Sequence, residues 1–598
     1  MLLNGCPMMS ASRSSRLLDA RALGSQPMRS AKQFASTGLC AIALLCLARA
    51  EGDDDVLGVM ADELDRSVGV LAEQRTPLYF LSYEITEVNA VSVAASFGAV
   101  SSNSRSESRF LDIDLRVGSK DLDNTHPGAD GLFDFRDPTV TEVPVSDPEA
   151  LRAALWLATD KKYRQEIEQF ARIEAGVQIK VAEEDRAADF SAQRAAEFKE
   201  EPRALAVDSS AWAPRLKRYS APFARAEHIL RGSVSLSAEA VTRWYVNSEG
   251  ARIRTSDTAH RLMVYGSTKA DDGMNLPRYV QFFAFGEDSL PDDEAVLEAV
   301  RQVIEDLQAL RAAPVAEPYS GPAILSGRAS GVFFHEILGH RVEGHRQREA
   351  ADAQTFKDMT GKSVLPESFS VVFDPSVRRA GGTDLVGYFK FDNEGVRGQR
   401  VVVIDRGVLR RFLMSRKPIE GFSGSNGHGR KEPGYAPVAR QSNLFVEVHT
   451  PLAASDLRAM LVSQLREEGR EYGLLFDKIQ GGFTFTGRMI PNAFNVLPTM
   501  VYRIYPDGRE ELVRGVDLIG TPLTTFSKIA AGGTDVEAFN GYCGAESGGV
   551  SVSAVSPSIL VSQIEVQRKE KSEQRPPLLP APSGRKHGTH AFSPGGRR

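Results

Sequence analysis

Two histidines and a glutamate share one short segment of this chain, the sequence HEILGH at residues 335–340. Imidazoles and a carboxylate this close together are typical of a metallohydrolase, in which the histidines bind the metal and the glutamate acts as a base. His335 and His340 are five residues apart. On an undistorted helix their side chains would therefore point about 140° away from each other. We predict a single π-type turn, eased by Gly339, that brings His340 beneath His335. The spacing alone also allows a chance occurrence without any metal.

The N-terminal region has the organisation of a secretory signal. A basic stretch at residues 28–32 precedes an uncharged apolar run at residues 38–47 and the sequence ARA at residues 48–50, which matches an A-x-A cleavage site. Residues 1–50 are therefore expected to be a signal region, and the chain to be exported to a periplasm or secreted. The alternatives are a cytoplasmic protein and one anchored in the membrane by the uncleaved signal. The apolar run is too short for stable membrane insertion.

Cysteine usage singles out one residue. Three of the four cysteines lie before residue 51, so removal of the signal would leave Cys543 alone in the mature chain. Outside the cytosol, such a thiol has no partner for an intramolecular disulfide. Coordination to a metal would protect it, and an ordinary buried free cysteine is the alternative.

Length and composition describe an ordinary globular protein. A chain of 598 residues is long enough for two or three domains, each with its own core. The net charge is -6, and 25% of the residues are charged and 42% hydrophobic. No excess of positive charge indicates a nucleic-acid partner or binding to a membrane surface, so neither is expected.

Hydrophobic periodicity predicts an α+β fold. We expect an N-terminal α+β domain at residues 51–215, a strand-rich domain at 216–570 that contains the metal site, and a disordered basic tail at 571–598. The elements expected in the first domain are helices at 53–74 and 147–204 and strands at 78–85, 90–97 and 109–117. Those expected in the second are strands at 233–238, 240–246, 252–256, 261–266 and 321–325, a helix at 292–310, and hairpins at 400–414 and 499–514.

Further landmarks follow the HEILGH segment. Glu343-Gly344 extends it to HExxxHxxEG, and the later segments are FDNEGVRGQ at 391–399, NGHGR at 426–430, RQSN at 440–443 and YCG at 542–544. With these segments in this order, the chain resembles the TldD/PmbA family of metallopeptidases, of the catalytic type, over about residues 320–565. Two departures stand out. Residues 543–549 lack the lysine and glutamine of the family's C-G-K-x-G-Q sequence, and His345 stands where an aspartate is common.

The resemblance implies a zinc site. Its ligands would be His335, His340 and Cys543, which leaves one open position, as in a catalytic rather than a structural zinc site. Glu336 would be the general base that accepts the proton of the attacking water. Glu343 is a candidate for orienting an imidazole, with a surface salt bridge as the alternative. His345 could compete with Cys543 as a ligand.

The same resemblance implies an N-terminal α/β domain followed by a strand-rich metallopeptidase domain, with the motif helix packed on an antiparallel sheet. It implies a zinc-dependent peptidase that hydrolyses unfolded or short peptides, bound as an added strand at a sheet edge. The assembly would be a homodimer, or a heterodimer with a metal-free family member. Two alternatives remain: a metal-dependent amidase acting on small molecules, and a non-catalytic peptide-binding subunit. The second would lack the His/Glu/His/Cys set that is present here.

Overall fold

The structure is a computed structural model that describes residues 56–127, 141–144, 147–179, 187–349, 352–487, 494–569 and 576–577. The expected signal at residues 1–50 and nearly all of the expected tail at 571–598 lie outside the described residues. Among the helices that are described, none is both long enough and apolar enough to cross a membrane.

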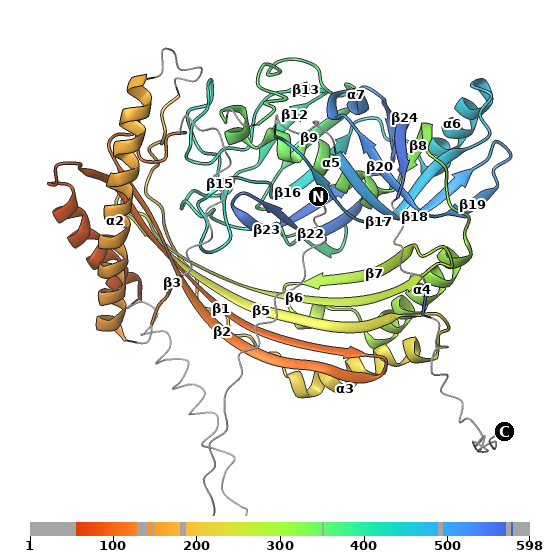
Figure 1. Cartoon of the computed structure of the whole chain (residues 1–598), viewed down its shortest axis with the longest axis horizontal. Helices are drawn as coiled ribbons and strands as arrows, with labels where there is room; N and C mark the ends of the chain where they lie inside the picture. The colour runs from red at the N-terminus through yellow and green to blue at the C-terminus, as the bar shows by residue number, and fades with distance from the viewer. Residues whose placement is uncertain are drawn as a thin grey trace, which may run out of the picture. The chain divides into compact units, whose positions relative to one another are not determined.

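A seven-stranded sheet forms the N-terminal half of the described chain. Its long strands are antiparallel and lie side by side in Figure 1: β1 (Leu78–Ser96), β2 (Ala99–Val117), β5 (Arg231–Asn247) and β6 (Arg252–Lys269). The strand order is β3-β2-β1-β5-β6-β4. The shorter strands are β3 (Thr141–Glu142), β4 (Glu197–Lys199) and β7 (Asn275–Ala284), which pairs with β6.

This sheet extends beyond the domain boundary expected after residue 215. Residues 231–284, which we assigned from the sequence to the strand-rich domain, belong to the N-terminal sheet, because β5 pairs with β1 along its length and β6 and β7 follow it. The strands expected at 78–85 and 90–97 are also one strand, β1. Polar residues such as Glu87 do not break β1, since β2 and β5 pair with it from both sides.

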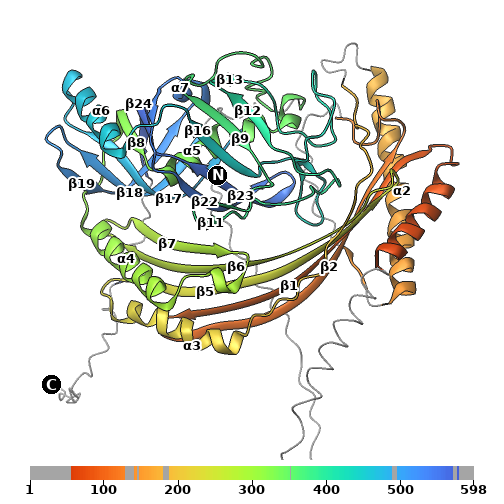
Figure 2. The same cartoon turned by 180° about the vertical axis from the view of Figure 1, so that it is seen from behind.

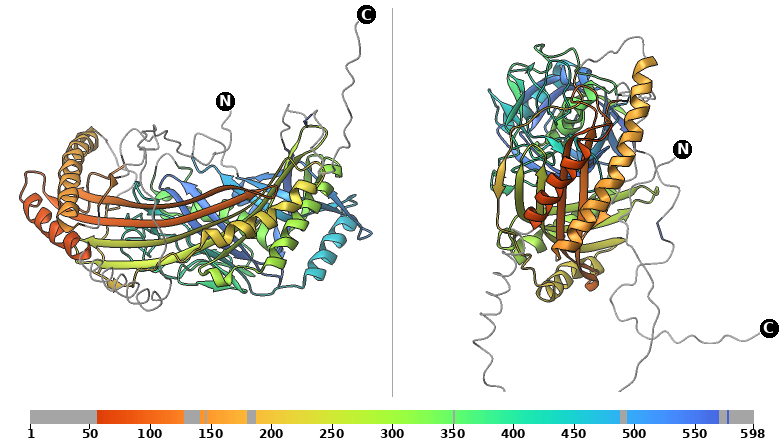
Figure 3. Two further views of the ribbon diagram at one scale, coloured as in Figure 1. Left: turned by 90° about the horizontal axis from the view of Figure 1, so that it is seen from below. Right: turned by 90° about the vertical axis from the view of Figure 1, so that its left-hand side faces the viewer.

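Helices cover two parts of the sheet. The helix at residues 56–71 and α2 (Pro148–Ile179) share an apolar cluster with β1 and β2 at one end of the sheet, as Figure 3 shows. In Figure 2, α3 (Ser209–Ser220) and α4 (Asp293–Ala312) lie on the face turned away from the C-terminal half. Two 3-10 turns, η1 (Ala221–Arg225) and η2 (Glu287–Ser289), flank these elements. The helix expected at 147–204 is shorter than predicted, since residues 187–208 contain β4 and no helix.

The C-terminal half contains two larger sheets. The first has the order β13-β12-β9-β16-β23-β22. In the second, β17, β8, β24, β20 and β18 follow one another, and a further pairing of β17 with β18 closes them into a ring. The strands of the first sheet are β9 (Phe369–Phe373), β12 (Val401–Asp405), β13 (Val408–Leu409), β16 (Asn443–Val448), β22 (Glu537–Ala545) and β23 (Gly548–Ser556). Those of the second are β8 (Tyr319–Leu325), β17 (Gly473–Thr484), β18 (Phe494–Ile504), β19 (Glu510–Val513), β20 (Val516–Gly520), β21 (Ile529–Gly532) and β24 (Ile559–Arg568).

The remaining elements of this half are short, apart from one helix on the outside of the ring. The two-stranded pairs are β10 (Arg379–Ala380) with β11 (Thr383–Asp384), and β14 (Gly429–Arg430) with β15 (Val438–Ala439). The helix α6 (Ala454–Glu467) packs on β8, β17 and β24 through leucines that recur every four residues, and α7 (Pro522–Phe526) contacts β24.

The motif helix α5 (Gly327–Ile337) contacts strands of both sheets, β17 and β18 on one side and β22 and β23 on the other. Its apolar residues join both sheets in one core, in which Phe333 packs edge-on against Phe494 of β18. The sheets are mixed rather than purely antiparallel as expected, because β16 and β23, and likewise β8 and β17, pair in parallel. A parallel pair needs a long connection between its strands, which the local pattern of the sequence does not show.

The FDNEGVRGQ segment joins the two halves. Arg243 of β5 donates hydrogen bonds to the carbonyl oxygens of Phe391 (2.7 Å) and Asp392 (2.8 Å), and the Tyr245 hydroxyl donates to that of Glu394 (3.0 Å). Both acidic side chains of the segment are buried, and burial raises the pKa of each carboxyl group. This landmark therefore has a structural role at the joint between the N-terminal sheet and the C-terminal half.

Candidate metal centre

The two histidines of the motif are placed by the end of α5 and the turn that follows it. The helix ends at Ile337, and the amide of Leu338 still donates to the carbonyl of Phe334 (3.0 Å). His340 lies in a 3-10 segment, η3 (Gly339–Val342), so the π-type turn that we predicted is wrong. The tighter turn brings the imidazole rings to a centroid distance of 5.0 Å, which a continued α-helix would not.

Gly339 is required for a reason that the sequence does not reveal. A Cβ atom at this position would lie 1.9 Å from Oε1 of Gln441, so the side chain of Gln441 occupies the space that a larger residue would need. From there, Nε2 of Gln441 donates a hydrogen bond to the carbonyl oxygen of His335 (3.3 Å). A residue about a hundred positions away thus fixes the backbone at the first histidine.

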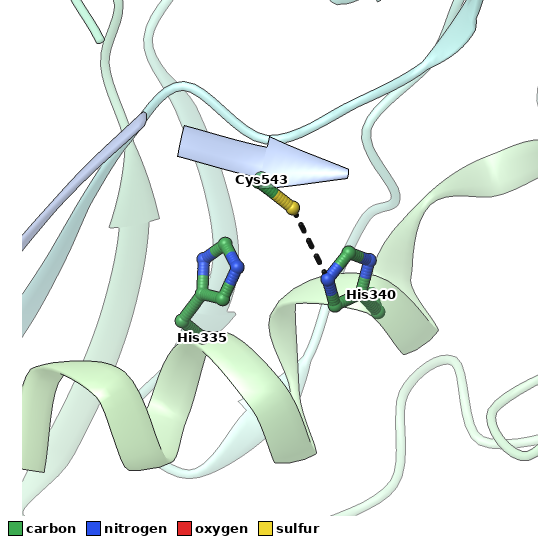
Figure 4. Close-up of side chains that lie close together, drawn as sticks. All are labelled: His335, His340 and Cys543. Atoms are coloured by element: carbon green, nitrogen blue, oxygen red, sulfur yellow. Dashed lines mark hydrogen bonds between the residues drawn. The ribbon is translucent and has the colours of Figure 1, made fainter. Parts of the chain in front are cut away.

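Cys543 reaches the same point from β22, which pairs with β23. Its Sγ lies 3.2 Å from Nε2 of His340, and the ligand atoms of His335, His340 and Cys543 all lie within 4.8 Å of one another. Figure 4 shows the three side chains converging. His340 and Cys543 are buried and His335 is half-buried. One thiolate and two imidazoles at this separation are a donor set that suits zinc, with a position left for a further ligand.

The ionisation of these groups favours a thiolate. Burial alone would raise the pKa of Cys543, but the neighbouring His340 and His335 lower it well below its usual range. Burial likewise opposes the charged form of His340, and the negative charges of Cys543 and Glu343 outweigh it, so the pKa of His340 is raised to about 10. Without a metal, Cys543 is therefore the thiolate of a thiolate–imidazolium pair with His340, and a metal ion would bind the sulfur and displace the proton of the imidazole.

Glu336 follows the first histidine and is buried. Its Oε2 atom has no hydrogen-bond partner within the described part of the chain. Burial raises the pKa of Glu336, although the histidines and Arg341 oppose the shift. A buried carboxylate oxygen without a partner is costly unless a ligand satisfies it. This observation fits a site built for a water molecule or substrate beside a metal.

Glu343 contacts the second histidine. Its Oε2 lies 3.3 Å from Nδ1 of His340 and accepts a hydrogen bond from Nε of Arg346 (2.9 Å). Burial would raise its pKa, but His340 and Arg346 lower it to about 2. The side chain is fully buried and lies beyond α5, so the surface salt bridge that was our alternative is wrong. A carboxylate on Nδ1 leaves Nε2 of His340 facing Cys543, the orientation that a zinc ligand needs.

His345 lies apart from the three converging side chains. Its Nε2 is hydrogen-bonded to Glu546, and Arg346 holds the same carboxylate through a bond of 2.8 Å. Among the described residues, His345 groups with Glu343 and Glu546, whereas Cys543 groups with His335 and His340. The geometry therefore supports Cys543 over His345 as the third ligand.

Several contacts around the site involve residues to which the sequence assigned no role. Arg440 and Gln441 belong to the RQSN landmark, which marked their importance but not their contacts. Arg346 and Glu546 had no local signal, because they meet across 200 residues of sequence.

Comparison with known proteins finds relatives of this half of the chain. Residues 318–568 match the PmbA/TldA metallopeptidase C-terminal domain. A metalloprotease of Archaeoglobus fulgidus is 28% identical over 267 residues, 45% of this chain and 58% of the relative. A zinc metalloprotease TldD homolog of Saccharolobus solfataricus is 24% identical over 271 residues, 45% of this chain and 57% of the relative. The chain thus spans little more than half the length of these two relatives.

The fold has a counterpart among solved structures. The crystal structure of TldE from Thermococcus kodakarensis superposes with a TM-score of 0.54 at 12% identity, covering 85% of this chain and 100% of that one. At this level of identity, the likeness concerns the fold alone. Since it covers 85% of this chain, the likeness extends beyond the matched C-terminal domain.

Proposed function

We propose that this chain, whose residues 318–568 match the PmbA/TldA metallopeptidase C-terminal domain, is a zinc-dependent peptidase acting on unfolded or short peptides. One observation carries the proposal. His335, His340 and Cys543, which are separated by up to 208 residues of sequence, converge within 4.8 Å beside the buried carboxylate of Glu336. A non-catalytic peptide-binding subunit would not need this combination.

Each residue of the proposed site has a separate role in the reaction. His335, His340 and Cys543 would hold the metal, which when bound supplies a Lewis acid that polarises the scissile carbonyl and acidifies the attacking water. Glu336 accepts the proton of that water and passes it to the leaving amine. Burial raises the pKa of Glu336, which makes its carboxylate a stronger base, so it takes up the proton of the water more readily than an ordinary carboxylate does. Glu343 holds His340 through Nδ1.

The substrate would bind along β22. This strand ends its sheet: it pairs with β23 and, among the described strands, with no other. A strand at a sheet edge presents backbone groups that an extended peptide can pair with, which gives affinity with little demand on sequence. Because β22 carries Cys543, a peptide added beside it would lie next to the metal-binding side chains.

Digestion of a peptide library tests the proposal. The purified chain should cleave unstructured peptides, lose this activity with a chelator and regain it with zinc. Glu336→Gln should keep the metal and lose about 10²- to 10⁴-fold in rate, because the change preserves the shape and removes the base. Glu174→Gln, at an exposed position of α2, is the matched control and should behave as the wild type.

Two results would count against the proposal. Near wild-type cleavage by Glu336→Gln would remove the general base from the mechanism. Hydrolysis of small amides with no cleavage of any peptide in the library would favour a small-molecule amidase instead.

A further inference from the structure

We propose that Arg440 is a positioning residue that holds the Cys543 sulfur in the orientation for metal binding and partly neutralises the negative charge of the thiolate. The inference rests on the proposed zinc site and concerns a residue outside the set of ligands. Arg440 lies between β15 and β16, and its side chain is fully buried. A guanidinium is always charged in proteins, so its burial here demands specific partners.

The guanidinium forms hydrogen bonds to Cys543 and to residues at the turn that connects β22 to β23. Nη2 of Arg440 donates to the Cys543 carbonyl oxygen (2.7 Å) and to its Sγ (3.3 Å). Nη1 donates to Oγ of Ser547 (2.8 Å) and to the carbonyl oxygen of Gly548 (2.9 Å). These bonds fix both the backbone and the sulfur of the ligand, since the planar fork allows few other arrangements.

The same side chain is connected to a second ligand. Nε of Arg440 lies 3.3 Å from Oε1 of Glu343, and both side chains are fully buried. The other carboxylate oxygen of Glu343 lies 3.3 Å from Nδ1 of His340. Arg440 therefore links β22, which supplies the sulfur, to the turn that supplies the second imidazole. Its positive charge also offsets the two negative charges that it faces.

A hydrogen bond to a metal-bound sulfur changes what the sulfur does. It withdraws electron density from the thiolate and fixes the direction of the lone pair that faces the metal, as partners of ligands do in other zinc sites. Lysine would keep the charge but could not make the forked contacts, and glutamine would lose the charge as well. Both substitutions should weaken the site while leaving all three ligands in place.

The test measures metal binding rather than turnover. Zinc affinity is determined by competition with a chromophoric chelator for the wild type, Arg440→Lys and Arg440→Gln. The same proteins are loaded with Co²⁺, and the sulfur-to-cobalt charge-transfer band is recorded. We expect a loss of about 10- to 100-fold in zinc affinity and a shifted band in both variants.

Arg416→Lys is the matched control. Arg416 is also fully buried, and it donates to the carbonyl oxygen of Ser191 (2.6 Å) and to Glu249 (2.6 Å). The Arg416→Lys substitution should lower the thermal midpoint of the protein without changing its zinc affinity or its cobalt spectrum. The inference is overturned if the Arg440 variants match the wild type in both metal measurements and lose only thermal stability, as the control does.

Other outcomes are also decisive. If the wild type binds no zinc, the proposed function fails and this inference fails with it. If the wild type binds zinc, and zinc affinity and the cobalt spectrum are equal in wild type and variants, the inference alone is overturned. If neither Arg440 variant folds, a crystal structure of the zinc-loaded wild type decides. Nη2 of Arg440 within hydrogen-bond distance of the metal-bound Sγ supports the inference, and a guanidinium turned away from it overturns the inference.

Discussion

Gly482→Ala should disable the site without touching a ligand. Gly482 lies in β17, against the side chain of Glu336. A Cβ atom there would lie 2.6 Å from Cγ and 2.9 Å from Oε1 of Glu336, and 3.0 Å from the backbone oxygen of Asn495. The backbone oxygen belongs to β18, which pairs with β17, so the carboxylate is the group that must move.

The size of the effect follows from this geometry. Carbon atoms in ordinary contact are about 3.5 Å apart, so the Glu336 side chain must shift by roughly 0.9 Å. A displacement of this order at a catalytic group costs about 100-fold in rate, or ~2.7 kcal/mol of transition-state stabilisation. The added methyl group should also lower the free energy of unfolding by about 1–3 kcal/mol, since the core has no room for it.

The assay measures three quantities for each protein: kcat/KM for a fluorogenic peptide, the zinc content and the thermal midpoint. Gly69→Ala is the matched control, because Gly69 lies in the helix at residues 56–71, outside the proposed site, and nothing lies within 4 Å of a Cβ atom there. We expect Gly482→Ala to keep its zinc and lose about 100-fold in kcat/KM, and the control to lose little. Activity of Gly482→Ala within threefold of wild type, with zinc content equal, would refute the placement of Glu336 as the base.

Two further predictions concern stability and location. Burial and the neighbouring Asp392 raise the pKa of Glu394 above its usual value of 4.5. At a pH above 4.5, the unfolded chain therefore releases a proton that the folded protein keeps. The free energy of unfolding consequently falls as the pH rises towards the pKa of the folded protein. Glu394→Gln should therefore show a smaller loss of stability between about pH 5 and 8 in urea titrations; equal slopes for both proteins would contradict this reasoning. We also propose that the chain is exported and cleaved after Ala50, so N-terminal sequencing of the protein from its native host should begin at Glu51; an uncleaved N-terminus in the cytosolic fraction would contradict the proposal.

Elements with a strong local pattern were predictable from the sequence. The hairpin of β12 and β13 was expected because Arg406-Gly407 separates two apolar runs, and both residues adopt the positive φ angles that such a turn uses. The helix α4 begins one residue after its predicted start, where Asp292 caps it by accepting a hydrogen bond from the amide of Ala295. In both cases, residues within or next to the element determine where it begins or turns.

Features decided by distant contacts were not predictable in this way. The side chain of Gln441 occupies the space beside Gly339, and the length of β1 depends on strands that pair with it from both sides. The residues of the metal centre were proposed from the order of landmarks, because no periodicity relates His335 to Cys543. Their convergence required the mixed sheets, whose parallel pairs leave no mark on local sequence.

The zinc content of the wild type and of Cys543→Ser, purified in parallel and freed of loosely bound metal, tests the central claim most directly. The claim is that Cys543 completes a site with the two motif histidines, whose ligand atoms lie within 4.8 Å of one another. Elemental analysis should find about one zinc per chain in the wild type and little in the variant, because the thiolate supplies both charge and polarisability to the metal. Equal zinc in the two proteins would contradict the claim and remove Cys543 from the metal centre.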